Sequence, residues 1–324
     1  MPVTDGNDPA ALAAAADALA AGALVAFPTE TVYGLGARAD DDAAVAGIFA
    51  AKGRPSDHPL IVHVADAAAI DVFALPPGPA ARALMAAFWP GPLTLILPRR
   101  PGAGAAAAGG QDSIGLRVPS HPLAQALLRA CAARGVAGVA APSANRFGRV
   151  SPTTAAHVAD EFGDGLLVLD GGPCEVGIES AIVDCTRATP ALLRPGGLDR
   201  TQLEAAIGQP LAAPDAASPR ASGTLEAHYA PRAKVVLFDG PALRAALAGP
   251  VPQGVAVYSA LLPPASAGVV HRAMPRRAAA AAHELFAVLR AFDAAGASQI
   301  WVERPPPGPA WDGVRDRLQR AAAA

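Results

Sequence analysis

The sequence predicts an α/β protein with two structural units, because short apolar, strand-like runs alternate with helical stretches along the chain. In the first unit the runs are unevenly spaced, which predicts a mixed, twisted sheet. The second unit follows a segment rich in Pro, Ala, Ser and Gly, and its regular alternation is typical of a small, largely parallel, Rossmann-like module. We therefore expect domains at 1–208 and 233–324, joined by a linker at 209–232.

The first unit contains short apolar runs that predict strands at 24–27, 60–64, 93–97, 114–118, 136–141, 166–169, 181–184 and 192–194. Helices are predicted at 9–21, 42–51, 79–88, 122–134, 153–161 and 199–207. The first helix has a clear start, since Asp8 can cap it and Pro9 suits the first helical position. Between these elements, we expect a hydroxyl-rich turn at 28–36 and a mobile surface loop at 102–110.

The second unit is predicted to contain strands at 234–238, 254–258, 269–272 and 298–303. Helices are predicted at 241–248, 278–295 and 311–322. The segment lacks the glycine fingerprint that places a dinucleotide on a Rossmann helix, so we assign it no cofactor.

Composition limits the classes of function. The 324 residues are 52% hydrophobic, but much of that is alanine, and no run has the length and bulk of a membrane span. We expect a cytoplasmic protein without a signal peptide. The net charge of −2 argues against a dedicated nucleic-acid binder, so any anion site must be local. Cys131, Cys174 and Cys185 lack metal-type spacing and are expected in the core.

Three basic residues stand out. Lys52 and Arg54 lie where a helix ends, and they either complement its C-terminus or grip a polyphosphate. Arg117 lies in an apolar strand, where it needs a partner, and a structural salt bridge and a ligand are equally compatible with it. His58 and His63 are five residues apart on an extended segment, which does not favour a metal pair.

Polar residues also follow two strand ends, the usual place for ligand contacts in α/β sheets. Ser143 and Asn145 follow one strand, while Ser151 and Thr153 either serve the same site or cap the next helix. Arg194 ends another strand. The chain has neither a Walker-type phosphate loop nor a nucleophile elbow. These features therefore indicate anion binding from several strand ends.

Taken together, the motifs resemble those of the threonylcarbamoyl-AMP synthase family in its long form. The segments that carry the resemblance are Pro28–Gly36, Lys52–Pro55, Pro59–His63, Ser113–Arg117, Pro142–Asn145, Ser151–Thr154, Gly177–Ser180, Leu193–Gly196 and His228–Pro231. The ordered set is specific, whereas the C-terminal part matches only by position, length and pattern. The resemblance implies a YrdC-like mixed, twisted sheet around a deep basic cavity, followed by a Sua5-type C-terminal domain.

The resemblance also implies an activity. L-Threonine, bicarbonate or CO2, and ATP with Mg2+ would give threonylcarbamoyl-AMP and pyrophosphate. A separate threonylcarbamoyl transferase complex would then modify adenosine at position 37 of transfer RNAs that read ANN codons. The implied partners are these substrates and that complex, with a transient contact to tRNA and none to a membrane.

Site residues follow from the matching motifs. The implied threonine pocket contains Thr31, His63, Arg117, Ala141 and Ser180. The implied ATP contacts are Lys52, Arg54, His58, Ser113, Ser143, Asn145, Ser151 and Arg194, with Tyr229 reaching over the nucleotide from the linker. No residue is assigned to a metal. In-line attack on a phosphate needs positioning and charge neutralisation without a covalent nucleophile, so the catalytic candidates are Lys52, Arg54, Ser143 and Asn145.

Three other interpretations remain open. One is an RNA-binding module without catalysis, although 5% aromatic residues leave little for base stacking. Another is an enzyme that forms a different carbamoyl adenylate, as related domains of hydrogenase-maturation proteins do. The third is a structural adaptor whose basic residues form salt bridges.

Overall fold

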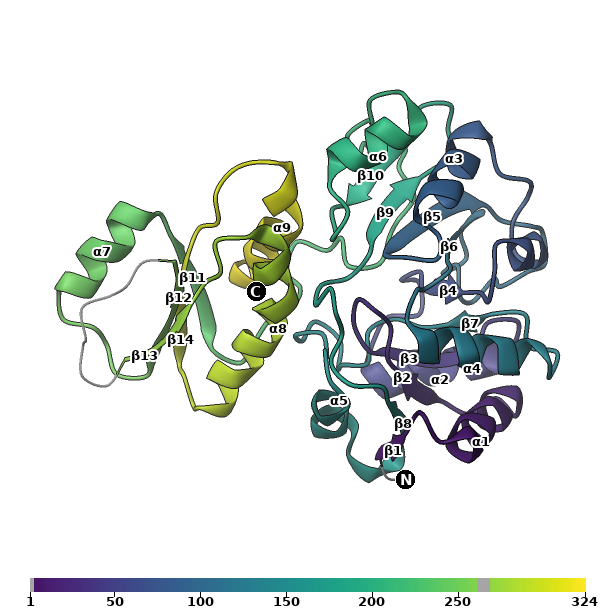
Figure 1. Cartoon of the computed structure of the whole chain (residues 1–324), viewed down its shortest axis with the longest axis horizontal. Coiled ribbons are helices and arrows are strands. Elements are labelled where there is room, and N and C mark those ends of the chain that lie inside the picture. Colours follow the sequence, from purple (N-terminus) through teal and green to yellow (C-terminus); the bar gives the residue numbers. More distant parts are fainter. Residues whose placement is uncertain (1–2, 261–268) are drawn as a thin grey trace.

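A computed structural model describes residues 3–260 and 269–324. The chain forms a large lobe built on one long sheet and a small lobe built on a second sheet, with two helices of the small lobe facing the large one (Figure 1). The segment predicted to be a linker, 209–232, runs between the sheets. The domain boundaries proposed from the sequence remain a prediction.

The large sheet is assembled from short strands, most of them buried: β1 (Val3–Asp5), β2 (Val25–Phe27), β3 (Gly34–Arg38), β4 (Ile61–His63), β5 (Leu93–Pro98), β6 (Ser113–Arg117), β7 (Val139–Ala140), β8 (Leu167–Asp170), β9 (Ala181–Asp184) and β10 (Ala191–Arg194). Their order is β1-β8-β2-β3-β7-β4-β6-β5-β9-β10. The sheet contains both parallel pairs, such as β4–β6, and antiparallel pairs, such as β5–β6. The predicted mixed sheet is therefore confirmed.

The helices of the large lobe pack around this sheet: α1 (Pro9–Ala20), α2 (Asp42–Lys52), α3 (Pro79–Phe88), α4 (Pro122–Ala132), α5 (Ala155–Phe162) and α6 (Arg200–Ile207), with short 3-10 turns at Ala68–Val72 and Gly163–Gly165. Asp8 caps α1 by accepting a hydrogen bond from the N–H of Ala10, and Pro9 takes the first helical position, as predicted. The helix α2 ends at Gly53, whose left-handed backbone turns the chain toward Arg54.

The small lobe contains β11 (Lys234–Phe238), β12 (Val255–Ser259), β13 (Val270–Ala273) and β14 (Gln299–Glu303), with α7 (Gly240–Ala248), α8 (Ala278–Ala294), a 3-10 turn at Pro309–Trp311 and α9 (Asp312–Ala322). The strand order is β11-β14-β12-β13, and each neighbouring pair in this order is parallel. This confirms the predicted parallel, Rossmann-like module. Helices α8 and α9 lie on the face of this sheet toward the large lobe, and α7 lies on the other face (Figure 1).

The structure differs from the sequence prediction in three short segments of the large lobe. The strand β1 was not predicted, because three residues are too few to show a period. The strand β3 begins at Gly34, inside the predicted turn. Glycine suits this strand: a Cβ at Gly36 would lie 2.8 Å from the Phe27 ring. The predicted surface loop at 102–110 instead buries Ala107 and Ala108, and the Ala107 carbonyl accepts from the N–H of Leu60.

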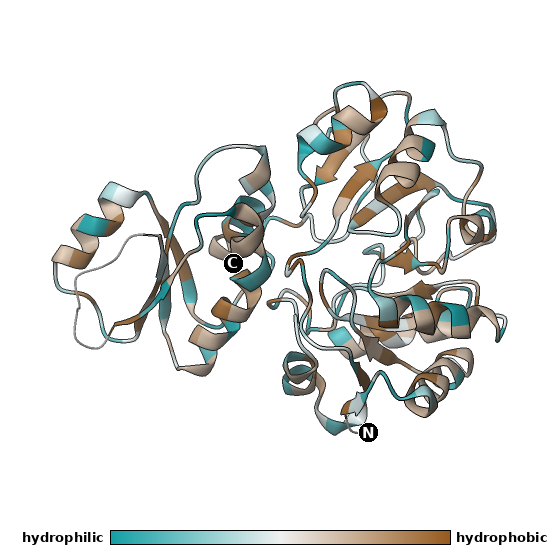
Figure 2. Cartoon of the chain, viewed as in Figure 1, coloured by the Kyte–Doolittle hydropathy of each residue, from teal (hydrophilic) through white to brown (hydrophobic). Residues whose placement is uncertain are grey.

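Apolar packing continues from one lobe into the other. One cluster of buried side chains joins Val32, Val150 and Ile178 of the large lobe to Tyr229 of the linker and to the inner faces of α8 and α9. Apolar positions of these helices and strands are coloured brown in Figure 2. The lobes therefore share a core, and the small lobe is packed as a fixed part of the molecule.

We predict that Gly177→Ala destabilises the protein through this shared core. Gly177 has φ of +80°, and a Cβ there would lie 2.2 Å from the carbonyl oxygen of His283 on α8. Backbone strain alone costs about 1–2 kcal/mol, and the clash adds about 1–3 kcal/mol. Gly135→Ala is the matched control, because Gly135 has φ of +79° and nothing lies near its Cβ position. Calorimetric melting temperatures that fall equally for both variants would contradict the packing argument.

Candidate active site

A cavity of about 40 Å³ lies where several strands of the large sheet end. It is lined from the β2–β3 turn, from β4 and β6, from the loop after β7, from the β9–β10 region and from the linker. Nine predicted site residues line it: Thr31, Arg54, His63, Arg117, Ala141, Ser143, Ser180, Arg194 and Tyr229. The structure therefore brings residues from eight of the nine quoted segments together around one space.

Arg117, at the end of β6, is held by the β2–β3 turn. Its guanidinium forms an ion pair of 2.7 Å with Glu30 and donates to the hydroxyl of Thr31 at 2.8 Å. Burial raises the pKa of Glu30, but the charge and hydrogen bond of Arg117 outweigh it, so the pKa lies below its ordinary value. The salt-bridge interpretation of Arg117 is confirmed. Arg117 also lines the cavity, and its contact with a ligand remains a prediction.

Lys52 lies beneath the loop that follows β7. Its ammonium donates to the backbone carbonyls of Ser143 and Asn145, at 2.5 Å each, so it supports this loop and does not line the cavity. Burial and the nearby Arg54 lower the pKa of Lys52 well below its ordinary value. An anion bound in the cavity would oppose this shift, since it favours the charged ammonium.

Arg54 and Arg194 are buried and point to the linker. Arg54 donates to the carbonyl of Pro59 and, at 3.4 Å, to the hydroxyl of Ser222. Arg194 donates to the carbonyl of Ser222 at 2.8 Å. Burial lowers the pKa of Arg54 to about 10. Among the described residues, no carboxylate lies within ion-pair distance of Arg54 or Arg194. The linker instead supplies neutral acceptors to both guanidiniums.

Ser180 and His63 also line the cavity. Ser180 shares a hydrogen bond of 2.8 Å with the hydroxyl of Thr94, and its carbonyl accepts two hydrogen bonds from Arg194. Burial, and then the charge of Arg117, lower the pKa of His63 to about 3. His63 is therefore a neutral imidazole at physiological pH, which suits it to accept or donate a hydrogen bond to a substrate.

Ser151 does not cap α5, which is one of the two roles open to it from the sequence. The cap is Thr154, whose hydroxyl accepts from the N–H of His157 at 3.3 Å. Ser151 is buried and donates a short hydrogen bond to the carboxylate of Glu179, which itself lines the cavity. Glu179 also pairs at 2.8 Å with Arg317 of α9. One carboxylate therefore links the large lobe, the cavity and the small lobe.

The remaining predicted residues lie around the cavity and not on its wall. Asn145 is buried, and its side chain donates to the carbonyls of Arg146 and Arg149. His58 and Ser113 line two other hollows beside the linker. The ring of His58 meets Phe147 edge to face, with centroids 5.4 Å apart. No observation here assigns a role to His58, Ser113, Asn145 or Ser151, so their roles as ATP contacts remain predictions.

Sequence reasoning missed the two carboxylates. Glu30 and Glu179 each lie inside a quoted motif, yet neither was named as a site residue. A signal was available, since an arginine in an apolar strand requires a buried partner. Arg317 carried no such signal, because it lies on a helix whose pattern resembles that of any half-exposed helix.

The charges around the cavity do not balance. Among the described residues, five buried basic side chains surround or adjoin it: Lys52, Arg54, Arg117, Arg194 and Arg317. Only two buried carboxylates, Glu30 and Glu179, accompany them. Burying unpaired positive charge is costly, so this excess favours an anion in the cavity. Between the charged residues, the cavity is lined by glycine, alanine and hydroxyl side chains, which are small enough for an anion to approach the backbone.

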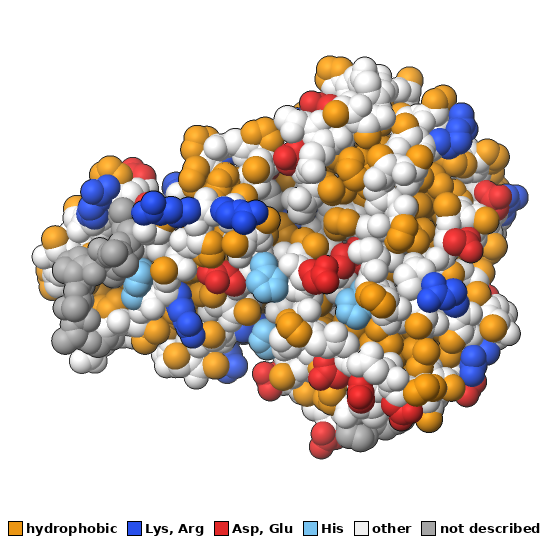
Figure 3. Space-filling model, viewed as in Figure 1, with side chains coloured by type: hydrophobic (Ala, Val, Ile, Leu, Met, Phe, Trp, Pro, Cys, Tyr) orange, Lys and Arg blue, Asp and Glu red, His pale blue; other side chains and the backbone are white. Residues whose placement is uncertain are grey.

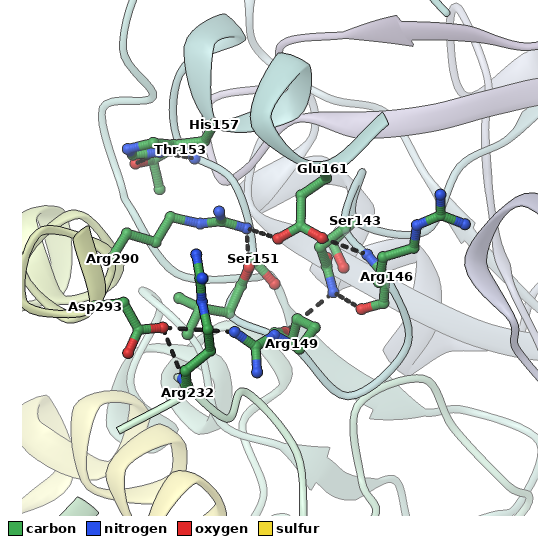
Figure 4. Close-up of polar contacts among 12 residues, drawn as sticks. Ser143, Arg146, Arg149, Ser151, Thr153, His157, Glu161, Arg232, Arg290 and Asp293 are labelled. Atoms are coloured by element: carbon green, nitrogen blue, oxygen red, sulfur yellow. Dashed lines mark hydrogen bonds and ion pairs between the residues drawn. The ribbon is translucent and has the colours of Figure 1, made fainter. Parts of the chain in front are cut away.

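A second hollow, of about 640 Å³, lies between α5 and α8 (Figure 4). Arg290 of α8 pairs with Glu161 of α5 at 2.8 Å. Asp293 accepts from the N–H groups of Arg232 and Ala233. Three arginines and three carboxylates line the hollow, so its charges balance and it lacks the excess that marks the first cavity. We assign it no ligand, and interpret its ion pairs as contacts between the lobes.

Other classes of site are not evident in the part of the chain that the structure describes. Its residues contain no group of three His, Cys, Asp or Glu side chains arranged to hold a metal, and no helix long and apolar enough to cross a membrane. Cys131 and Cys174 are buried and Cys185 is half-buried, and burial raises the pKa of each thiol. On the face drawn in Figure 3, Lys and Arg side chains lie in separate groups among acidic and apolar ones.

Comparison with known proteins accounts for both lobes. Residues 17–196 match the family described as "Telomere recombination", and residues 198–323 match "Threonylcarbamoyl-AMP synthase, C-terminal domain". The chain belongs to the threonylcarbamoyl-AMP synthase family. The family resemblance inferred from the motifs is thereby confirmed.

Relatives in this family include proteins named threonylcarbamoyl-AMP synthase from Bacillus subtilis and Pyrococcus abyssi. The first is 46% identical over 242 residues, which cover 72% of this chain and 68% of that protein. The second is 44% identical over 226 residues, which cover 68% of this chain and 65% of that protein. The matched part thus spans about two thirds of each curated relative.

One solved structure is similar to this protein over nearly its whole length. It is described as P. abyssi Sua5 complexed with L-threonine, has a TM-score of 0.87 and is 35% identical in sequence. The likeness covers 96% of this chain and 94% of that one, so it includes the small lobe. The expected fold class is confirmed by this agreement.

We predict that Glu30→Gln destabilises the protein in a pH-dependent way. Leaving Arg117 buried without its counter-ion should cost about 3–5 kcal/mol at neutral pH. The pKa of Glu30 in the folded protein lies below its ordinary value of 4.5, so its stabilising contribution is complete above that pH and is lost as the pH falls.

Urea unfolding between pH 7 and pH 3 measures this effect. The gap in unfolding free energy between wild type and Glu30→Gln should narrow below about pH 4.5. Asp112→Asn is the control, because that carboxylate is exposed and lies 3.9 Å from Arg99. A gap that does not change with pH would show that the Glu30 charge is not the stabilising group.

Proposed function

We propose that the protein is an ATP-dependent nucleotidyltransferase that converts L-threonine, bicarbonate or CO2, and ATP into threonylcarbamoyl-AMP and pyrophosphate. The observation that carries this proposal is the cavity with five buried basic side chains and two carboxylates. A triphosphate supplies the missing negative charge. Family membership and the threonine complex of the related Pyrococcus protein support the identity of the substrates.

The chemistry required is an in-line displacement. Threonine and CO2 form a carbamate without assistance. A carbamate oxygen then attacks the α-phosphorus of ATP, the new oxygen–phosphorus bond forms, and the bond to the β-phosphate oxygen breaks to release pyrophosphate. No covalent enzyme intermediate is needed, so the protein contributes alignment and charge neutralisation.

For the nucleotide half, we propose Arg54 and Arg194 as direct phosphate donors, since both guanidiniums are buried at the cavity wall. Ser143 lies on the same wall. Lys52 acts from behind it: its ammonium fixes the Ser143 and Asn145 carbonyls, and its charge adds to the field at the α-phosphate. His58, Ser113 and Ser151 remain the proposed outer contacts to ATP.

For the threonine half, we propose Thr31, His63, Arg117, Ala141 and Ser180, which all line the cavity. Arg117 is oriented by Glu30, so it presents a fixed cation to the threonine carboxylate. His63 is neutral and buried beside it. The wall therefore combines a fixed cation with short hydroxyls, which suits a small zwitterionic amino acid.

We also propose that the linker acts as a lid. The cavity of about 40 Å³ is far smaller than the ~300–1,000 Å³ that pockets for larger ligands enclose. Ser222, Gly223, His228 and Tyr229 of the linker fill the remaining space. The Ser222 carbonyl holds Arg194, so a phosphate would replace it as the acceptor when the linker moves out.

Other parts of the proposal rest on the family resemblance. Mg2+ is proposed to enter with the ATP phosphates, because Glu30 and Glu179 are both paired with arginines and the described residues offer no protein-built metal site. The adenylate would pass to a separate transferase complex that modifies adenosine 37 of tRNA. A cytoplasmic location fits these substrates.

The direct test of the proposal is product identification. Incubation with 13C-bicarbonate, threonine, ATP and Mg2+ should give a product whose mass equals threonylcarbamoyl-AMP with one 13C, together with one pyrophosphate. Omitting threonine should abolish both products. Pyrophosphate release without a labelled, threonine-dependent adenylate would contradict the proposed reaction and favour a different carbamoyl adenylate.

We predict that Lys52→Met and Arg54→Met each lower turnover by about 100-fold or more, by analogy with the loss of an oxyanion-stabilising donor. Arg82→Met is the matched control, since Arg82 is an exposed cation on α3, away from the cavity. A pyrophosphate-release assay at saturating substrates measures turnover. Rates near that of wild type for either variant would remove that residue from the catalytic set.

A further inference from the structure

Among the described residues, the most deeply buried cation comes from the small lobe. Arg317, on α9, is 1% exposed although the rest of its helix is highly polar. Its side chain crosses to the large lobe, where it contacts Glu179, just before β9, and Pro195, just after β10. A guanidinium in such a place needs complete hydrogen bonding to be tolerated.

Arg317 obtains this bonding from the active-site segments. Its Nε pairs with the Glu179 carboxylate at 2.8 Å, and Nη2 donates to the Glu179 carbonyl at 3.3 Å. Its Nη1 donates to the carbonyl of Pro195 at 2.9 Å and to Asp316 at 2.7 Å. One side chain therefore fixes both the main chain and the carboxylate of a residue that lines the cavity.

Two groups proposed for the nucleotide depend on this arrangement. The Glu179 carboxylate accepts a hydrogen bond from the Ser151 hydroxyl. This bond fixes the orientation of the hydroxyl, and so the direction of its lone pairs. The Arg317 guanidinium also lies 5.2 Å from the ring centre of Tyr229. Tyr229 is fully buried with a φ of +61°, a conformation that surrounding contacts must maintain.

The threonine half is held by side-chain contacts outside α9, and one of its supports, Arg194, is shared with the nucleotide half. Ser180 is held by Thr94 and Arg194, and Arg117 is held by Glu30. None of these three contacts involves α9. Loss of Arg317 should therefore disturb one half of the site and leave the other in place.

We propose that Arg317 is a positioning residue through which the small lobe sets the nucleotide half of the active site. The inference rests on the proposed function for the identity of the two halves. It gives the small lobe a specific task, because the helix α9 carries the side chain that orients Glu179, Ser151 and Tyr229.

The test compares dissociation constants for ATP and for L-threonine by isothermal titration calorimetry on the full chain. Arg317→Met should weaken ATP binding by about tenfold or more, since a charge-assisted hydrogen-bond network is lost. Threonine binding should change by less than about threefold, because its supporting contacts lie outside α9. Arg315→Met is the control, as Arg315 lies on the same helix, is 39% exposed and pairs only with Asp312 among the described residues.

A purely structural role predicts a different result. Irreversible unfolding of part of the sample would reduce the number of binding sites and leave both constants unchanged, and a reversible loss of folded protein would weaken both ligands by the same factor. Either outcome would overturn the proposal. If Arg317→Met does not fold, the double variant Glu179→Gln with Arg317→Met replaces it, because it leaves no buried charge unpaired. ATP binding of wild-type strength in that variant would also overturn the proposal.

The two proposals fail separately. If wild type binds ATP and threonine but forms no adenylate, the proposed reaction is wrong while the binding comparison still decides the role of Arg317. If wild type forms the adenylate and Arg317→Met binds ATP normally, only the positioning role is wrong.

Discussion

Everything in this structure depends on how buried positive charge is compensated around one cavity. Arg117 and Arg317 each have a carboxylate partner, whereas Arg54 and Arg194 have only neutral acceptors, two of them on the linker. The large sheet makes this arrangement possible, because its mixed topology brings the ends of β4, β6 and β10 to the same region. The unmatched charge favours an anion in the cavity, and this preference connects the fold to the proposed triphosphate substrate.

The shared core explains why the small lobe cannot be treated as an appendage. Val150 and Ile178 of the large lobe pack in the same cluster as Leu285, Phe286 and other residues of α8. The ring of Tyr229 stacks on Phe286, with centroids 5.5 Å apart. Apolar packing thus holds the C-terminal end of the linker at Tyr229, while hydrogen bonds to Arg54 and Arg194 hold Ser222 over the cavity. A segment fixed at one end and weakly bonded at the other is suited to open and close.

Much of the fold and part of the site could be predicted from the sequence. Long periodic segments such as α8 were predicted almost to the residue, because burial of one face leaves a clear pattern. The strand β3 was missed because its glycines, needed for close packing on Phe27, look like a turn. The motifs identified the cations but not Glu30, Glu179 or Arg317, since ion pairs between distant segments leave no local pattern.

The central claim, that the cavity binds a polyphosphate through its unmatched cations, is tested most directly by ligand-dependent melting. Because a ligand that binds only the folded state stabilises it by mass action, ATP and pyrophosphate should both raise the melting temperature progressively with concentration. Adenosine, which carries no charge, should have little effect. A melting temperature that responds equally to adenosine and ATP, or to neither, would contradict the account.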